Sequence, residues 1–338
     1  MIELKKVLGL CAVAALVTAG PARADNAELR IATLAPSGSP WMAVLDKAAS
    51  EVREKTASRV TIKYFDGGQQ GDERDFVRKI KLGQLDGAFV TSIGLSMIDE
   101  SIRVLELPMM FDSVEEVDYV ADKMWPYFQK KFQKKGITLT DRSEVGWIYF
   151  LSKAKVGSLA DLRGMKVWQW GDDHVIDALY KKLGVSGVPL GAPEVDSSLV
   201  SGRLGACYGS PIAAVAMQWF SKIKYMTSMP FAFAISATVV STDALKKLST
   251  EDQKTVEDIG KSSAKKLRRV IRKANDDART TMTRKGVTVV ETPAAMVDEF
   301  TKDAGEVQKN LVGKVYSQEE LAMVLQYRDE FRAKAKKK

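Results

Sequence analysis

Apolar and polar positions alternate along the chain with two periods, one typical of strands and one typical of helices. Three short β-branched or apolar runs predict strands, at residues 29–33, 59–65 and 85–91. Between the first two, apolar residues recur every three or four positions over residues 41–55, which predicts a helix. Ser39 is placed to cap this helix and Pro40 to occupy its first turn. A second helix is predicted over residues 72–82, and the strand–helix–strand order favours a mostly parallel sheet.

A long helical segment, residues 113–135, contains Pro126 and is followed by a second set of strands and helices. Further strands are predicted at 146–152, 165–168, near 188, and at 204–208, 223–227, 233–241 and 287–290. Further helices are predicted at 173–183, 193–201 and 293–336. Residues 250–285 hold no proline and one glycine, Gly260, so they predict a helix longer than about 50 Å. The two sets of alternation predict an α/β chain with two lobes.

The first 24 residues have the pattern of an export signal. Lys5 and Lys6 precede an apolar stretch at residues 7–17, which Gly20 and Pro21 end. The small-x-small sequence Ala-Arg-Ala at residues 22–24 predicts cleavage after Ala24 and localisation in the periplasm; an uncleaved N-terminal anchor is the alternative. The chain holds no apolar run of about 18 residues or more, which excludes a protein with several membrane spans.

Composition and charge place the chain among ordinary globular proteins. It is 45% hydrophobic and 28% charged, with a formal net charge of +8. The positive charges are scattered over predicted helices, and the densest run is the C-terminal tail at residues 334–338. We interpret this charge as solubility and weak attraction to anionic surfaces, so we expect no nucleic-acid partner and only peripheral contact with a membrane.

The chain lacks the residue sets that enzymes and metal sites use. After cleavage it would keep one cysteine, Cys207, and one histidine, His174, which excludes an internal disulfide and argues against zinc. The acidic pairs at 72–73 and 172–173 begin predicted helices, where the helix dipole favours acids. The sequence has no Gly-x-Ser-x-Gly elbow and no phosphate loop. We therefore expect neither an enzyme nor a bound cofactor.

Seven short segments, taken in order, resemble a known family over nearly the whole mature chain. They are Arg-Ile-Ala at 30–32, Pro-Ser-Gly-Ser-Pro at 36–40, Glu-Val and Lys-Thr within 51–56, Gly-Asp-Glu-Arg at 71–74, and the runs 82–88, 107–111 and 161–167. The chain resembles the periplasmic solute receptors of tripartite ATP-independent periplasmic (TRAP) transporters, the DctP-type family. This resemblance implies an α/β, two-lobed Venus-flytrap fold with hinge strands and a long interlobe helix.

The resemblance also implies domain boundaries and partners. The first lobe would comprise residues 25–143 and about 234–268, and the second residues 144–233 and about 269–338. A small-molecule ligand would bind between the lobes and close them. The closed receptor would then dock on a small and a large TRAP membrane subunit. Some branches of the family use a helical-repeat partner in place of these subunits or beside them.

The ligand-clamping arginines of the family are missing from this sequence. Trp168 stands where typical members carry the arginine that binds the ligand carboxylate, and Ile148 where many carry a second. An Arg–carboxylate contact contributes about 1.5–3 kcal/mol, so the usual organic-acid ligand loses its main anchor. We expect a relatively hydrophobic or aromatic ligand instead. An organic acid held by a rearranged clamp, and a lipid carrier or scaffold that acts without a transporter, are the alternatives.

The candidate ligand-binding residues lie where strands end, since open α/β sheets bind ligands at the carboxyl ends of their strands. They are Trp168, Trp147, Trp41, Trp170, Tyr208, Ser210, Thr91, Ser92, Trp219 and Gln70. Each tryptophan has core filling as its alternative role, most of all Trp219, which follows a helical apolar stripe. For the hydroxyl residues the alternative is a helix cap.

Overall fold

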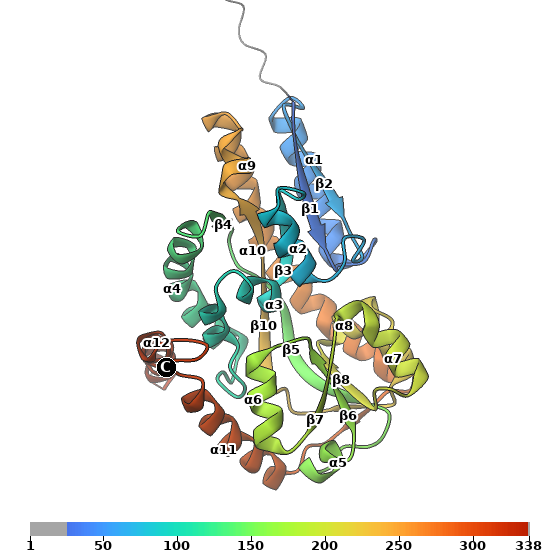
Figure 1. The fold of residues 1–338 in the computed structure, drawn as a ribbon. Helices are drawn as coiled ribbons and strands as arrows, with labels where there is room; N and C mark the ends of the chain where they lie inside the picture. The colour runs from blue at the N-terminus through green and yellow to red at the C-terminus, as the bar shows by residue number, and fades with distance from the viewer. Residues whose placement is uncertain (1–25, 337–338) are drawn as a thin grey trace, which may run out of the picture.

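The computed structural model describes residues 26–336, so the predicted export signal lies outside the described part of the chain. The first lobe begins with three strands and two helices (Figure 1): β1 (Ala27–Thr33), α1 (Pro40–Lys55), β2 (Val60–Phe65), α2 (Glu73–Lys81) and β3 (Gly87–Thr91). Strands β2 and β3 flank β1 and run parallel to it. The predicted cap is confirmed, because the Ser39 side chain accepts the Met42 N–H and Pro40 begins α1.

Four further elements follow along the chain: α3 (Ser92–Ser96), the 3₁₀ helix η1 (Glu100–Glu106), α4 (Val114–Gln133) and β4 (Ile137–Leu139). Pro126 lies inside α4 without ending it. The sequence pattern did not predict η1, which joins α3 to the segment before α4. Its position matters below, because η1 carries two charged residues into the interior.

The second lobe repeats the alternation of strands and helices. It contains α5 (Leu159–Arg163), β6 (Lys166–Trp170), α6 (His174–Leu183), β7 (Ser186–Leu190), η2 (Ala192–Glu194), α7 (Val195–Ser201), β8 (Ala206–Gly209), α8 (Pro211–Ala216), η3 (Trp219–Lys222) and β9 (Tyr225–Thr227). Strand β6 runs parallel to β7 and β8. The carboxyl ends of β6 and β8 therefore lie near one another.

Two long antiparallel strands, β5 (Ser143–Ser152) and β10 (Ala232–Ser241), connect the lobes. Strand β10 also pairs with β3 in the first lobe, and β5 pairs with β8 in the second. Through these pairs the described strands form one sheet in the order β2-β1-β3-β10-β5-β8-β6-β7, with β4, β9 and β11 at its sides. Figure 1 shows β5 and β10 in the middle of the molecule, between the two lobes.

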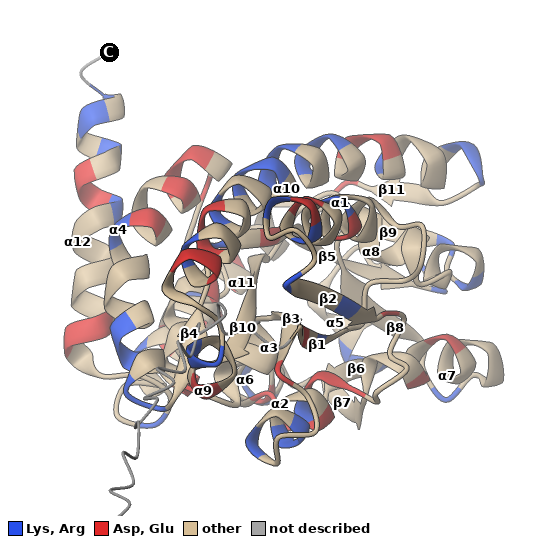
Figure 2. Ribbon diagram, turned by 90° about the horizontal axis from the view of Figure 1, so that it is seen from above, with Lys and Arg blue, Asp and Glu red and all other residues tan. Residues whose placement is uncertain are grey.

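The C-terminal part begins with α9 (Thr242–Lys246) and the predicted long helix, α10 (Thr250–Arg284), which is confirmed at 35 residues. Strand β11 (Thr288–Val290) follows, and the region predicted as one helix is two, α11 (Ala294–Asn310) and α12 (Gln318–Ala335). Helix α12 packs on α4, where Lys123 pairs with Glu330 and Lys131 with Glu320. Figure 2 shows basic and acidic residues interspersed along α10 and α12. Within residues 26–336 we find no helix with the length and apolar character of a membrane span.

Candidate functional site

A pocket lies where strand ends of both lobes meet the crossing strands. Its walls come from the start of α3, from η1, from β5 and β10, and from the ends of β6 and β8. A second pocket adjoins it and shares the residues Thr91, Val145, Trp170, Ala213 and Trp219. We call the two together the cleft. This is the position at which open α/β folds bind small molecules.

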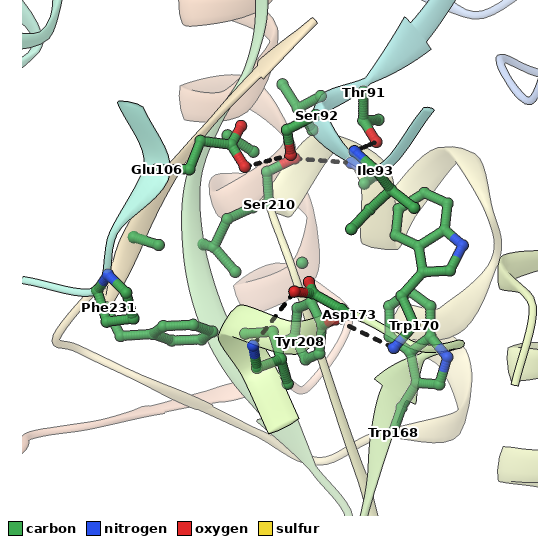
Figure 3. Close-up of a pocket in the computed structure, with 18 of the residues that line it drawn as sticks. Thr91, Ser92, Ile93, Glu106, Trp168, Trp170, Asp173, Tyr208, Ser210 and Phe231 are labelled. Carbon is green, nitrogen blue, oxygen red and sulfur yellow. Dashed lines mark hydrogen bonds between the residues drawn. The ribbon is translucent and has the colours of Figure 1, made fainter. Parts of the chain in front are cut away.

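One wall of the cleft is a cluster of four aromatic side chains from the second lobe. The Trp168 ring stacks on Tyr208, with centroids 4.8 Å apart and planes 23° from parallel. Trp170 lies 5.3 Å from Trp168, and Trp219 meets Trp168 edge to face at 5.4 Å. Figure 3 shows Trp168 and Trp170 one above the other at the end of their strand. The cluster therefore forms an apolar wall of aromatic side chains on this side of the cleft.

Eight of the ten residues predicted from the sequence line the cleft. They are Trp168, Trp41, Trp170, Tyr208, Ser210, Thr91, Ser92 and Trp219. The two positions at which the family resemblance implied arginines, Trp168 and Ile148, are both among the lining residues. Trp168 is only 1% exposed, and its Nε1–H donates to the Leu190 carbonyl oxygen at 3.0 Å.

The structure does not bring Trp147 and Gln70 to the cleft. Successive side chains of a strand point to opposite faces. Because Ile148 of β5 lines the cleft, Trp147 lies on the other face, where it packs edge to face on Phe233 at 5.1 Å. The Gln70 side chain accepts a hydrogen bond from Lys79 Nζ at 2.8 Å and lines neither pocket of the cleft.

Sequence reasoning missed four charged residues that line the cleft: Arg103, Glu106, Asp173 and Glu73. Arg103 is buried, and its Nη1 donates to Ser92 Oγ at 3.1 Å while its Nη2 donates to Asp173 Oδ2 at 2.9 Å. The Glu106 carboxylate lies 3.8 Å from Arg103 Nη1. A signal for two of them is present in the sequence, because Arg103 and Glu106 interrupt an otherwise apolar run at residues 102–107. Charged residues in such a run are buried only when they have partners.

Two buried carboxyl groups in the walls have raised pKa values. Glu106 accepts hydrogen bonds from the Ile235 N–H and the Ser92 hydroxyl, yet burial raises its pKa to about 7. Burial likewise raises the pKa of Glu73 to about 8, although Thr91 and Gly94 donate to its carboxylate. Both groups are therefore substantially protonated at neutral pH. Since Arg103 and Asp173 oppose one another, the lining of the cleft carries little net charge.

The segment after β6, residues 170–174, joins the two lobes across the cleft, and we call it the bridging segment. Each of its polar side chains pairs with the first lobe: Trp170 with Asp72 (3.0 Å), Asp172 with Arg74 (3.3 Å), Asp173 with Arg103 (2.9 Å) and His174 with Glu100 (2.5 Å). Gly171 lies so close to Arg74 that a Cβ at this position would meet Nη2 at 1.9 Å. The bridging segment therefore depends on the lobes being close together.

Comparison with known proteins identifies the family. Residues 31–315 match the family model of DctP, described as bacterial extracellular solute-binding protein, family 7. The chain belongs to the DctP family. The family consists of solute-binding receptors and not of enzymes, and its extracellular character implies that this receptor works in the periplasm.

Relatives and solved structures agree with this assignment. The uncharacterized protein YiiZ of Salmonella typhimurium is 30% identical over 244 residues, covering 70% of this chain and 72% of that protein. A solute-binding protein of Roseobacter denitrificans is 25% identical, covering 88% and 93%. The TRAP solute-binding protein of Xanthobacter autotrophicus with bound β-D-galacturonate has a TM-score of 0.83 at 20% identity, covering 89% of this chain and 99% of that one. The sugar-acid-binding DctP protein of Advenella mimigardefordensis, in complex with galactonate, has a TM-score of 0.85 at 18% identity, covering 90% and 99%.

The cleft of this DctP receptor has the chemistry of a binding site. Its lining combines aromatic rings, small residues and a few buried polar groups, as small-molecule sites do. The described residues 26–336 contain no group of three or more His, Cys, Asp or Glu side chains that could hold a metal ion. Cys207 is completely buried within β8, and burial raises the pKa of its thiol.

Proposed function

We propose that this DctP-family receptor captures a small, relatively hydrophobic or aromatic ligand in the cleft and delivers it to a small and a large TRAP membrane subunit. The observation that carries the proposal is the aromatic cluster, with Trp168 at the place of the family's clamping arginine. A tryptophan ring buried against a ligand removes up to about 150–250 Å² from water. Trp168, Tyr208 and Trp219 are already buried in the protein, whereas Trp170 is half-buried. At about 25 cal/mol/Å², covering the exposed part of Trp170 is therefore the main gain that a ligand obtains from this cluster.

Closure follows from contacts that a bound ligand would make with both lobes. The cleft is lined by first-lobe residues such as Thr91 and Ser92 and by second-lobe residues such as Trp170 and Tyr208. A ligand that touches both sets gains contacts only when the lobes approach, and the equilibrium shifts by that difference in free energy. The closed form would be the one that docks on the membrane subunits, or on a helical-repeat partner.

A second candidate function is reception of an organic acid through a rearranged clamp, and Arg103 is the observation that favours it. The structural neighbours described above carry galacturonate and galactonate, and a receptor of Bordetella pertussis with a TM-score of 0.83 carries pyroglutamic acid. In this chain, however, Arg103 is already paired with Asp173 and lies beside Glu106. A carboxylate ligand would have to compete with both carboxyl groups.

The test of the ligand class is native mass spectrometry of the freshly purified receptor, followed by binding measurements with the molecule that co-purifies. We expect an apolar or aromatic molecule. Replacing Trp170→Ala should weaken its binding about tenfold or more, because the ligand loses one ring face. Trp147→Ala is the matched control, since it removes a half-buried tryptophan that does not line the cleft. A co-purified sugar acid, or equal effects of the two variants, would contradict the proposal.

We also propose that the receptor is exported with cleavage after Ala24. N-terminal sequencing of the protein recovered from the periplasm should then begin at Asp25. Recovery of the intact N-terminus from the membrane fraction would instead support the uncleaved anchor.

A further inference from the structure

The cleft holds two buried hydrogen-bonding atoms that have no partner within the described residues. One is Nε of Arg103, whose side chain is 6% exposed, and the other is Oγ of Ser236 on β10, which is completely buried. Arg103 lines the first pocket of the cleft and Ser236 the second. Buried polar atoms normally find partners, because leaving them without one costs free energy. A ligand in this cleft can supply the missing partners.

The guanidinium of Arg103 can donate a further hydrogen bond, and its positive charge is already paired with the carboxylate of Asp173. Its Nη2 donates to Asp173 and its Nη1 to Ser92, and Glu106 lies 3.8 Å from Nη1. Among the three guanidinium nitrogens, Nε alone has no hydrogen-bond acceptor within residues 26–336. The positive charge is therefore already matched inside the protein before a ligand arrives.

We propose that the ligand carries an uncharged hydrogen-bond acceptor on its apolar body, such as an amide, ketone or ester oxygen, and that the Nε–H of Arg103 binds it. Asp173 is then a specificity residue, because it neutralises Arg103 and makes this end of the cleft reject carboxylates. The inference rests on the proposed function, since it names the polar group of the same apolar ligand.

Charged ligands fit this end of the cleft poorly. A carboxylate on Arg103 Nε would lie near the carboxylate of Asp173, and like charges repel strongly where water is excluded. An ammonium group would lie near the guanidinium of Arg103 instead. An uncharged oxygen accepts the Nε–H and meets neither penalty.

The experiment uses four probes that share a phenyl ring and a three-carbon chain and differ only at the end. They are propylbenzene, 3-phenylpropanamide, 3-phenylpropanoate and 3-phenylpropylammonium. Calorimetric titration of the purified receptor should show the amide binding about tenfold more tightly than propylbenzene, and more tightly than either ion.

Two neighbouring aspartates of the bridging segment provide a matched pair of variants. Asp173→Asn keeps the side-chain oxygen that caps α6 but removes the charge opposite Arg103, so the affinity ratio of carboxylate to amide should rise about tenfold or more. Asp172 also pairs with an arginine of the first lobe but does not line the cleft. Asp172→Asn should therefore leave this ratio unchanged. Arg103→Lys, which keeps the charge but lacks Nε, should abolish the advantage of the amide over propylbenzene.

The outcomes separate this inference from the function on which it rests. If propylbenzene and the other probes all fail to bind, the proposal of an apolar ligand fails, and the inference with it. If propylbenzene binds and the amide binds no more tightly, the inference is overturned while the proposed function stands. If the carboxylate binds best to the parent receptor, the inference is overturned in favour of the organic-acid alternative.

Discussion

Glu106 shows how the interior of the cleft changes the properties of a single residue. Its carboxyl group accepts hydrogen bonds from Ile235 and Ser92, and Arg103 lies nearby; all three contacts favour the ionised form. Burial has the larger effect, and the pKa rises from 4.5 to about 7. The folded receptor therefore holds a proton on Glu106 at pH values where the unfolded chain has released it.

This difference predicts how stability depends on pH. Between pH 4.5 and about 7 the folded state binds more protons than the unfolded chain, so the free energy of unfolding falls as the pH rises through this window. We expect Glu106 to contribute about 1–3 kcal/mol to that fall. Glu106→Gln keeps an oxygen for Ile235 and gains an amide that can donate to Ser92, but it does not titrate.

The measurement is urea unfolding of the parent receptor and of Glu106→Gln on both sides of this window. The variant should lose less stability than the parent as the pH rises. Glu73, whose pKa is about 8, titrates in both proteins and therefore does not affect the comparison. Parallel stability curves for the two proteins would show that Glu106 does not hold its proton in the fold.

Sequence reasoning identified the aromatic side of the cleft better than the charged side. Trp168 and Ile148 were found through the resemblance, which ties each position to a ligand contact. Trp147 was included as a tryptophan at a predicted strand end, yet it lies on the face of β5 opposite to the one that Ile148 presents to the cleft. Arg103 was missed because its role depends on Asp173, which is distant in the sequence and reaches it only in the folded molecule. The interruption of the apolar run 102–107 signals a buried charge, but it does not identify the partner of that charge.

At the scale of elements, capping residues predicted where helices begin, but the short connection between α11 and α12 was not predicted. Ser39 and Pro40 begin α1 as predicted, and α10 extends from Thr250 to Arg284. The region after Pro293 was predicted as one helix because its apolar spacing continues. It breaks at residues 311–317, where Gly313 has a φ of +76° and Ser317 caps the next helix. Single glycine and serine residues also occur inside helices, so Gly313 and Ser317 alone did not predict this break.

The bridging segment allows a prediction about Gly171, whose φ is +55°. Alanine in this left-handed region costs about 1 kcal/mol. A Cβ would also displace Arg74 from its 3.3 Å contact with Asp172, but that pair is largely exposed and contributes little. We therefore expect Gly171→Ala to lower the free energy of unfolding by about 1 kcal/mol.

Gly202→Ala is the control for this prediction. Gly202 has a φ of +78° and nothing within 4 Å of an added Cβ, so only the backbone cost applies. Urea unfolding should give nearly equal losses for the two variants. A loss several kcal/mol larger in Gly171→Ala would mean that the contact between Arg74 and Asp172 stabilises the molecule far more than exposed ion pairs do.

At the scale of the whole molecule, the lobes are connected in two different ways. Strands β5 and β10 carry the chain between the lobes, with a register shift between Ala234 and Ile235 and with Gly146 at a φ of +108° beside Asn275. These irregular positions lie where a hinge must bend. The bridging segment instead connects the lobes through side chains, and in the proposed closure these contacts would form and break as the lobes move. In the proposed closure, strands β5 and β10 would set the axis about which the lobes move. The side-chain pairs of the bridging segment would set what fraction of the receptor molecules is closed.

The buried pair of Arg103 and Asp173 should therefore control closure more than the exposed pair of Arg74 and Asp172. The side chains of the first pair are 6% and 4% exposed, and those of the second 42% and 77%. Removing one partner of a buried pair leaves an uncompensated charge, and here the penalty applies only when the lobes are together.

Asp173→Asn should shift the receptor toward the open form, with a larger radius of gyration in solution scattering. The double variant Arg103→Met with Asp173→Asn should return it to the parent value, because both charges of the pair are then removed. Asp172→Asn should match the parent throughout. Scattering from Asp173→Asn that is identical to that of the parent would show that this pair does not hold the lobes together.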